Sequence, residues 1–385
     1  MIVGVIGSGT MGAGIAQVAA TAGNKVLLFD SNPEALQQGK VNLERILSRL
    51  VEKGKYPEEK KTAILSHIDY IENLREIATA DLVIEAIVEN AEIKKEVFKK
   101  IESLVNDECI IASNTSSLSI ASLASALKRP ERFIGIHFFN PAPLMKLVEI
   151  VPAIQTGAGV TQCAKEVIDR WGKVTVMAKD TPGFIVNRVA RPFYGEAIRI
   201  YEEGIANAAT IDWAMKAIGG FRMGPFELMD FIGHDVNYTV SETVFKAFFY
   251  DPRYKPSFTQ KRLVEAGYLG RKSGKGFYNY ENPETNPVPE EDLEPGKKIM
   301  QRIVVRIINE AADARYLNIA TKEDIDLAMT AGVNYPKGPL TWADEWGVSH
   351  CVNILDDLYQ KYREGQYRCT VLLRKMAETD ERFFN

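Results

Sequence analysis

The first thirty residues constrain the fold more than any other part of the chain. An apolar run at residues 2–6 leads into G-S-G-T-M-G at positions 7–12, and an alanine-rich helical pattern follows over 13–22. A second apolar run, 26–29, ends on Asp30. Strand, glycine turn, helix, strand and acid in this order predict a dinucleotide-binding βαβ unit. The cofactor contacts predicted here are Gly7, Gly9, Thr10, Met11, Gly12 and Asp30.

Each glycine of this motif has a physical reason. Gly7 allows the tight turn, Gly9 lets the backbone approach a pyrophosphate, and Gly12 lets helix and strand pack closely. The phosphates then lie at the positive end of the helix dipole. Asp30 accepts hydrogen bonds from a ribose 2′-hydroxyl and repels a 2′-phosphate, which favours NAD over NADP. A glycine-rich turn in another kind of α/β protein is the alternative.

Length and composition set further bounds. A chain of 385 residues is expected to form two or three domains. Its net charge of −4 gives no electrostatic reason to expect a nucleic-acid partner. No apolar run has membrane-spanning length, and a strand at residue 2 leaves no room for a signal peptide. Four scattered cysteines suit a reducing, cytoplasmic compartment, and four unpaired histidines do not support a metal site.

Alternation of strands and helices continues to residue 177. The predicted elements are helices 33–53 and 57–66, strand 81–86, helix 91–104, strand 109–112, a weak helix 117–127, strand 133–138, an apolar run 147–151, helix 159–171 and strand 174–177. Strand ends in such a sheet converge on the cofactor crevice. We therefore expect Glu89, Asn114, Ser116 and His137 to lie together near the nicotinamide half of the cofactor.

His137 ends a buried strand, and Glu149 lies inside the next apolar run. A buried carboxylate needs a partner, and His137 is in reach across a proline-rich turn. Such a pair makes the imidazole more basic and fixes its tautomer, which suits a general base. A purely structural pair is the alternative, and the position at the cofactor end of a strand favours the functional interpretation.

Basic residues surround Gly54 at the end of the 33–53 helix, namely Arg49, Lys53 and Lys55. A solvated helix end explains them most simply. The alternative, functional interpretation is that Lys53 contacts a phosphorylated substrate.

The sequence K-D-T-P-G-F at 179–184 interrupts the pattern, and strand signals stop there. Residues 184–203 predict one long helix with Asn187 in its first turn, where its amide would face the first domain. An ordinary polar residue near a helix start is the alternative.

The remaining sequence is helical and contains a repeat with a constant offset of 114 residues. The matching positions are Asn187-Arg188 with Gln301-Arg302, Glu196 with Glu310, Asp212 with Asp326, Gly224-Pro225 with Gly338-Pro339, Asp230 with Asp344, and Gly233 with Gly347. A constant offset indicates tandem duplication. We predict a Rossmann-type α/β domain (1–182), a first helical copy (183–280), an extended linker (281–297) and a second helical copy (298–385).

Gln301 replaces Asn187 in the second copy, which has no Rossmann domain of its own and is therefore interpreted as structural. The hypothesis is that it covers the surface that a partner subunit would otherwise cover. Deleting residues 290–385 should then give a dimer or an insoluble protein. The oligomeric state, monomer or homodimer, stays open.

Together these motifs resemble the L-3-hydroxyacyl-CoA dehydrogenase family, including 3-hydroxybutyryl-CoA dehydrogenases. The matching stretches, all within residues 1–280, are 7–12, 85–90, 113–117, 137–149, 180–188 and 223–230. The second copy is similar to family forms with a duplicated C-terminal domain.

The resemblance implies roles for particular residues. By it, His137 is the catalytic base, Glu149 orients it, and Ser116 and Asn187 hold the reacting oxygen. The further cofactor contacts that it implies are Asp30, Glu89, Lys94 and Asn114. A basic segment such as 53–55 lies near coenzyme A in such enzymes, although Gly54 stands where another lysine would be expected.

The implied reaction is reversible NAD-dependent oxidation of a (3S)-3-hydroxyacyl-CoA to a 3-oxoacyl-CoA. Two alternatives remain open: a dehydrogenase of a free hydroxy acid in the same superfamily, and a non-catalytic NAD-binding protein. The joint presence of Ser116, His137, Glu149 and Asn187 argues against the second.

Overall fold

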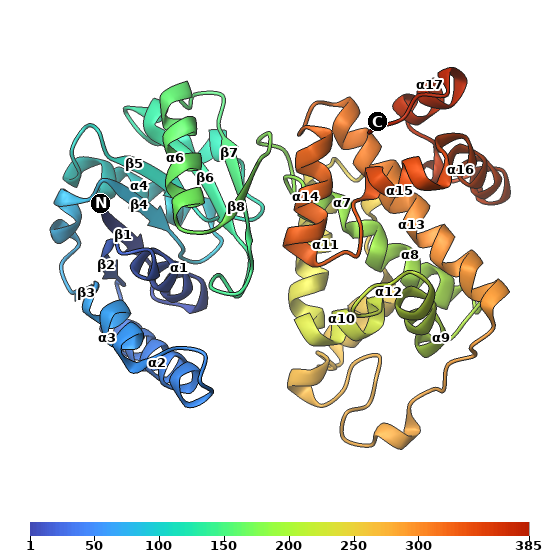
Figure 1. The fold of residues 1–385 in the computed structure, drawn as a ribbon, viewed down its shortest axis with the longest axis horizontal. Helices are drawn as coiled ribbons and strands as arrows, with labels where there is room; N and C mark the ends of the chain where they lie inside the picture. Colours follow the sequence, from blue (N-terminus) through green and yellow to red (C-terminus); the bar gives the residue numbers. More distant parts are fainter. Residues whose placement is uncertain (385) are drawn as a thin grey trace. The chain divides into compact units, whose positions relative to one another are not determined.

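The computed structural model describes residues 1–384, and its contacts divide the chain into two compact units, Met1–Thr181 and Pro182–Asn385. We call them the sheet unit and the helical unit. Figure 1 shows the strands within the first and helices throughout the second. The predicted order, a Rossmann-type α/β unit followed by a helical region, is confirmed.

Within the described residues, the sheet unit holds one eight-stranded sheet in the order β3-β2-β1-β4-β5-β6-β7-β8. Its strands are β1 (Ile2–Ile6), β2 (Lys25–Phe29), β3 (Ile68–Ile71), β4 (Leu82–Glu85), β5 (Ile110–Ser113), β6 (Phe133–Phe138), β7 (Leu147–Pro152) and β8 (Val174–Met177). Neighbours are parallel except for β6 and β7, which are antiparallel. The strand order reverses between β1 and β4, and in open α/β sheets ligands bind outside the carboxyl ends of strands at such a point.

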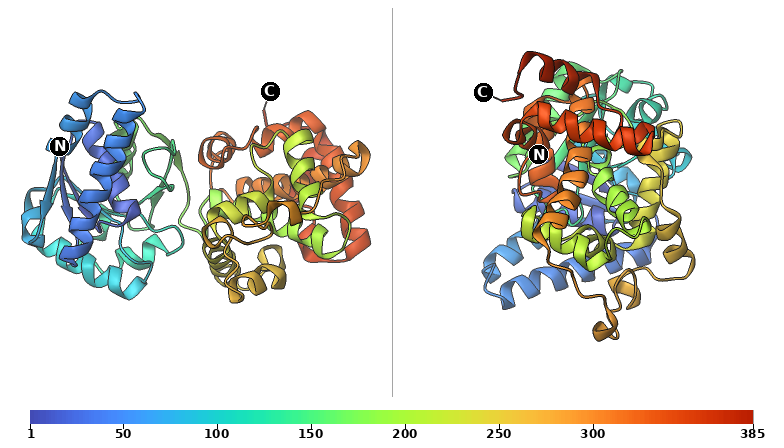
Figure 2. Two further views of the ribbon diagram at one scale, coloured as in Figure 1. Left: turned by 90° about the horizontal axis from the view of Figure 1, so that it is seen from below. Right: turned by 90° about the vertical axis from the view of Figure 1, so that its right-hand side faces the viewer.

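Helices lie on both faces of this sheet (Figure 2). They are α1 (Thr10–Thr21), α2 (Pro33–Glu52), α3 (Glu58–Ser66), α4 (Ala91–Leu104), α5 (Ile120–Ala124) and α6 (Ala158–Arg170). On one face, Val3 and Val5 of β1 share a core with Ile15 of α1. On the other, Phe98 of α4 meets Phe133 of β6 edge to face, with ring centroids 4.7 Å apart. Residues buried on alternate faces of each strand are what a sheet covered on both sides requires.

Two local predictions were incomplete. Strand β3 was not predicted, because Asp69 and Tyr70 interrupt its four residues and only Ile68 and Ile71 are buried. The helix predicted over 184–203 is two helices, α7 (Val186–Val189) and α8 (Arg191–Glu202). Pro192 explains the break, because it has no N–H to donate to the preceding turn.

The helical unit continues with α9 (Ala208–Trp213), the π-helix η3 (Ala214–Ile218), α10 (Pro225–Ile232), α11 (His234–Ala247), α12 (Phe258–Glu265), α13 (Leu293–Tyr316), α14 (Lys322–Val333), α15 (Pro339–Trp346), α16 (Val348–Tyr362) and α17 (Val371–Thr379). Short 3-10 turns are η1 (Leu74–Thr79), η2 (Pro130–Arg132), η4 (Pro252–Tyr254), η5 (Arg271–Ser273), η6 (Pro283–Thr285) and η7 (Gly365–Tyr367). Helices α8 and α13 contact each other, and both carry buried charges on their shared surface.

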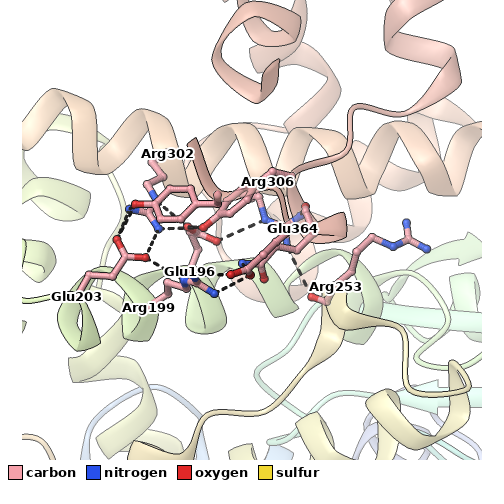
Figure 3. Close-up of polar contacts among 10 residues, drawn as sticks. Glu196, Arg199, Glu203, Arg253, Arg302, Arg306 and Glu364 are labelled. Carbon is pink, nitrogen blue, oxygen red and sulfur yellow. Dashed lines mark hydrogen bonds and ion pairs between the residues drawn. The ribbon is translucent and has the colours of Figure 1, made fainter. Parts of the chain in front are cut away.

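Together with Arg188 of α7, these buried charges form two matched ion pairs. Arg188 Nε lies 2.8 Å from Glu310 Oε1, and Arg302 Nε lies 2.6 Å from Glu196 Oε1. Arg302 lies 114 residues after Arg188, and Glu310 lies 114 residues after Glu196. Each ion pair therefore joins the same two positions of the repeat, with the two copies exchanged. Figure 3 shows the Arg302–Glu196 pair with Glu203 beside it.

Aromatic contacts repeat in the same way. The guanidinium carbon of Arg188 is 5.3 Å from the Phe248 ring centroid, and that of Arg302 is 4.8 Å from Tyr362, again 114 residues on. The hydroxyl of Tyr367 donates to Glu196 at 2.7 Å, and that of Tyr254, which lies 113 rather than 114 residues earlier, donates to Glu310. An interface in which each side gives the same groups is expected between two copies of one domain. These contacts support the tandem duplication, which remains our proposal.

Removing the charge of Glu310 should destabilise the helical unit strongly. Glu310→Gln leaves Arg188 and Arg253 only the partly exposed Asp313 and Asp251, and breaking a buried pair costs up to about 3–5 kcal/mol. Glu294→Gln, which removes an exposed pair with Lys297 on the same helix, should cost less than about 1 kcal/mol. Denaturant unfolding of the two variants compares them. Equal losses would mean that the Glu310 cluster does not hold the two segments together.

Glu203 gives the interface a pH dependence. Burial raises the pKa of Glu203, but hydrogen bonds from Arg302, Tyr362 and Arg199 outweigh it and lower the pKa to about 2. A lowered carboxyl pKa stabilises the fold above the unfolded value and loses that contribution as the pH falls through the folded value. The free-energy difference between the wild type and Glu203→Gln should therefore shrink as the pH falls from about 5 to about 2. Denaturant unfolding at several pH values measures it, and a constant difference would contradict the assignment.

Candidate active site

The glycine loop between β1 and α1 leaves an open cradle at the helix start. Gly7 has φ +104°, and a Cβ there would lie 2.5 Å from the Ala86 carbonyl oxygen. At Gly12 a Cβ would lie 1.8 Å from the Gly7 oxygen, whereas nothing lies within 4 Å of a Cβ built on Gly9. The loop therefore fits a dinucleotide pyrophosphate, with the backbone at Gly9 accessible and α1 starting at Thr10.

Asp30 follows β2 and braces the same loop. Its Oδ2 accepts hydrogen bonds from Ser8 N at 2.8 Å and Ser8 Oγ at 2.9 Å, and its Oδ1 accepts one from Asn32 N at 3.0 Å. The carboxylate is thus fixed beside the glycine loop at the carboxyl end of β2. This position suits the adenosine-ribose contact predicted for Asp30, which remains a prediction.

Glu89 organises the loop that carries Ser116. Its Oε1 accepts hydrogen bonds from Thr115 Oγ1 at 2.6 Å, Ser116 N at 3.2 Å and Ser117 Oγ at 2.9 Å. Burial raises the pKa of Glu89, but Lys94 and the bonds from Thr115 and Ser117 outweigh this effect and lower it. Glu89 therefore holds the Ser116 loop as an ionised carboxylate.

Lys94 is buried and contacts Glu89, so it does not lie at the surface. Its side chain is 1% exposed, and its Nζ lies 2.5 Å from Glu85 Oε1 and 3.2 Å from Glu89 Oε2. Glu85 in turn accepts a hydrogen bond from Ser113 Oγ at 2.7 Å. Lys94 acts on the Ser116 loop through Glu89, and reaching a cofactor directly would require it to leave this pair.

His137 and Glu149 face each other across the one antiparallel pair of strands in the described sheet. They are register partners of β6 and β7, with His137 Nδ1 2.7 Å from Glu149 Oε2. Glu149 is fully buried and His137 is 6% exposed. The carboxylate fixes which ring nitrogen carries the proton on its side, and so orients the imidazole.

Asn114 ties this pair to the loop. Its Oδ1 accepts a hydrogen bond from Phe138 N at 2.8 Å, directly after His137. Asn114 thus contacts the residue that follows His137, and Ser116 contacts Glu89. That the four residues meet at the nicotinamide remains a prediction.

The other two predicted residues lie elsewhere. Lys53 is the exposed C-cap of α2, next to Gly54 with φ +66°. Asn187 lies in the first turn of α7 in the helical unit, as predicted, partly exposed. Their proposed contacts with substrate remain predictions.

Sequence reasoning missed the supports of this site. Glu85 ends β4 and contacts Lys94, Ser113 ends β5 and donates to Glu85, and Asp180 accepts hydrogen bonds from the segment after the Ser116 loop. Asp180 accepts hydrogen bonds from Ile120 N at 2.9 Å and Ala121 N at 2.7 Å. Glu85, a charge at the end of an apolar strand, is the same signal that identified Glu149 and could have been found by the same reasoning.

Removing Lys94 should test this support. Lys94→Met leaves Glu85 buried without its cation, which should lower the free energy of unfolding by about 3–5 kcal/mol. Lys99→Met is the matched control on the same helix, since its pair with Glu96 is fully exposed and contributes little to stability. The double variant Glu85→Gln/Lys94→Met should recover part of the loss in the same denaturant experiment. A loss at Lys94 no larger than at Lys99 would show that the buried pair is not a support.

Fold and site together define a class of protein, a NAD-dependent dehydrogenase with a Rossmann-type sheet and a helical C-terminal region. The family model described as 3-hydroxyacyl-CoA dehydrogenase, NAD binding domain, matches residues 2–181. The model described as 3-hydroxyacyl-CoA dehydrogenase, C-terminal domain, matches residues 183–280 and again 299–382. The chain belongs to the 3-hydroxyacyl-CoA dehydrogenase family, whose members are NAD-dependent oxidoreductases.

Similar proteins span different shares of the chain. It is 37% identical to the 3-hydroxyadipyl-CoA dehydrogenase of Escherichia coli K12, over 97% of each chain. It is 45% identical to the 3-hydroxybutyryl-CoA dehydrogenase of Bradyrhizobium diazoefficiens, over 74% of this chain and 97% of the relative. A crystal structure of 3-hydroxybutyryl-CoA dehydrogenase from Escherichia coli K12 superposes with a TM-score of 0.92 at 36% identity, covering 98% of both chains. Among the described residues, no helix is long and apolar enough to cross a membrane.

Proposed function

We propose that the chain interconverts (3S)-3-hydroxyacyl-CoA and 3-oxoacyl-CoA, with His137 and Glu149 as an acid–base dyad. The observation that carries the proposal is the 2.7 Å contact between His137 Nδ1 and Glu149 Oε2, beside the loop that presents Ser116. An imidazole held by a buried carboxylate is suited to accept a proton near neutral pH.

The chain's own groups carry the proton and hold the substrate. His137 takes the proton of the 3-hydroxyl group, and Glu149 stabilises the imidazolium that forms. Ser116 and Asn187 hold the reacting oxygen, which restricts the orientation of the carbon that bears it. When bound, NAD⁺ supplies the acceptor for the hydride that leaves C3.

Coenzyme A recognition and assembly belong to the same proposal. We assign Lys53 to the coenzyme A phosphates, since it is an exposed cation at the end of α2.

We infer a monomer, because the contacts of Arg188 and Arg302 make one buried interface of the kind that two partner subunits would form. A cytoplasmic location agrees with four cysteines, all within the described residues, that are free thiols.

The reaction is tested with a panel of 3-oxoacyl-CoA esters of increasing chain length and the matching free 3-oxo acids, assayed with NADH and with NADPH. We expect oxidation of NADH with the esters and little with the free acids. Turnover of free acids alone would replace the proposal by the free-acid alternative. No turnover of any compound would favour a non-catalytic protein.

The dyad is tested by two substitutions. His137→Ala should lower kcat by about 10²–10⁴-fold, the usual contribution of general-base catalysis. Glu149→Gln should cause a comparable loss and leave the dissociation constant of NADH nearly unchanged, because Glu149 touches His137 rather than the glycine loop. Steady-state kinetics and NADH fluorescence titration give the two values. A His137 variant that keeps most of its activity would remove His137 from this role.

A further inference from the structure

The turn that joins β6 to β7 lies directly after the strand that carries His137. It spans residues 139–146 and includes one helical turn, in which two backbone N–H groups donate to the Pro141 oxygen at 3.0 Å. Strand β6 ends one residue after His137, and Glu149 is the third residue of β7. The conformation of this turn therefore bears on the part of the sheet that holds the two dyad residues.

Lys173, the residue before β8, closes this turn from one side. Its Nζ donates to the Ala142 oxygen at 2.5 Å and to the Met145 oxygen at 2.8 Å. The next residue, Val174, donates its backbone N–H to the Lys146 oxygen at 2.9 Å. Hydrogen bonds from two consecutive residues thus fold the turn against the start of β8, and those from the ammonium group are of the strong, charge-assisted kind.

The ammonium group of Lys173 has no carboxylate partner. Within residues 1–384, no Asp or Glu side chain lies within ion-pair distance of its Nζ. Asp169 of α6, the acid nearest in sequence, is paired with Lys165 at 2.7 Å and accepts a hydrogen bond from Thr175 Oγ1 at 2.7 Å. Burial lowers the pKa of Lys173 to about 8, with no charged neighbour to raise it. Two main-chain oxygens of the turn are therefore what holds this half-buried cation in place.

On its other side the turn packs against α1. A Cβ built on Gly14 would lie 3.2 Å from Pro143 Cδ and 3.3 Å from Ala142 Cβ, so a side chain at this position would press against the turn. Ala142 is buried in the same contact. The turn is thus held between α1, which begins at the glycine loop, and Lys173 at the start of β8.

Phe139, the first residue of the turn, contacts the imidazole of His137. The centroids of the two rings are 4.5 Å apart, and the angle between their planes is 53°. Glu149 holds the imidazole at Nδ1, and the Phe139 ring limits how the imidazole can turn about that contact. Phe139 precedes by three residues the first oxygen that Lys173 binds, so a shift of the turn would also shift this ring.

We propose that Lys173 is a positioning residue for the dehydrogenase reaction: it holds the 139–146 turn, and the turn keeps the ring of Phe139 against the imidazole of His137. This rests on the proposed function, which assigns the proton transfer to His137. In this role Lys173 acts through the turn and not through contact with substrate or cofactor. The effect on the rate is geometric, because a misplacement of about 1 Å can cost about a hundredfold.

Lys173→Met is the main variant, since it keeps an unbranched side chain and removes the ammonium group. We expect kcat with a 3-oxoacyl-CoA ester and NADH to fall roughly tenfold to a hundredfold. The dissociation constant of NADH should stay nearly unchanged, because Asp30 and not the turn braces the glycine loop. Lys173→Arg keeps a charged donor for the two oxygens and should retain more activity than Lys173→Met. A folded Lys173→Met protein with the kcat of the wild type would overturn the proposal.

A spectroscopic measurement reports on the ring contact directly. The chain has four histidines, so the protein labelled with ¹³C at the histidine Cε1 positions gives four signals, and His137→Ala identifies one of them by its loss. The ring current of Phe139 acts on this signal. Lys173→Met should shift the His137 signal and leave the other three in place. An unchanged His137 signal in the folded variant would overturn the proposal.

Phe139→Leu tests the route by which Lys173 acts. This variant removes the aromatic ring, so adding Lys173→Met to it should lower kcat by less than about twofold. A double-mutant cycle of this kind measures the interaction between the two positions. Fully additive losses in the double variant would mean that Lys173 acts by another route, and would overturn the proposal.

Lys165→Met is the matched control. Lys165 lies on α6, which packs against β8, and it forms an exposed pair with Asp169. The variant therefore removes one positive charge near β8 without touching the turn. We expect kcat and the His137 signal to stay as in the wild type, since an exposed pair contributes little. An equal fall in kcat for the two lysine variants would mean that the charge of this region matters rather than the turn, and would overturn the proposal.

Failure of this inference and failure of the proposed function give different results. If His137→Ala loses its activity and Lys173→Met changes neither kcat nor the His137 signal, the inference is overturned and the function stands. If His137→Ala keeps most of its activity, the dyad is overturned, and the role of Lys173 in the reaction is overturned with it. A shifted His137 signal in Lys173→Met would then retain only the structural contact.

Discussion

A carboxylate buried in a sheet strand needs a polar partner, and this requirement organises the site at the carboxyl ends of the strands. Glu85 at the end of β4 is paired with Lys94, and Glu149 within β7 is hydrogen-bonded to His137. Removing either carboxylate from water is costly, so each partner is held in one geometry. The orientation of the imidazole and that of the Ser116 loop, through Glu89, are both consequences of pairing buried charge.

Much of the sheet unit could be predicted because its signals are local. The glycine loop, Asp30 and the apolar strands follow from short patterns, and α4 has the predicted bounds of 91–104. His137 and Glu149 were paired from a charge in an apolar run, and their register contact agrees with that inference. Strand β3 was not predicted, because it has only four residues, two of them polar, and so short a segment shows no hydrophobic periodicity.

The supporting contacts were harder to predict, because they join distant segments. The hydrogen bond from Ser113 to Glu85 spans 28 residues, and those to Asp180 span about 60. The identity of Lys94 was visible in the sequence, but its burial between two carboxylates depends on how α4 packs against the sheet.

The paired contacts of Arg188 and Arg302 have a consequence for how such an enzyme can diverge. In an assembly of identical subunits every substitution occurs in both subunits. A substitution that stabilises one side of the interface must therefore also be tolerated on the other side. When both halves are encoded in one polypeptide, each position varies alone. Position 301, which corresponds to Asn187, is a glutamine. One copy can thus change a residue while the other keeps it, a difference that a symmetric pair cannot adopt.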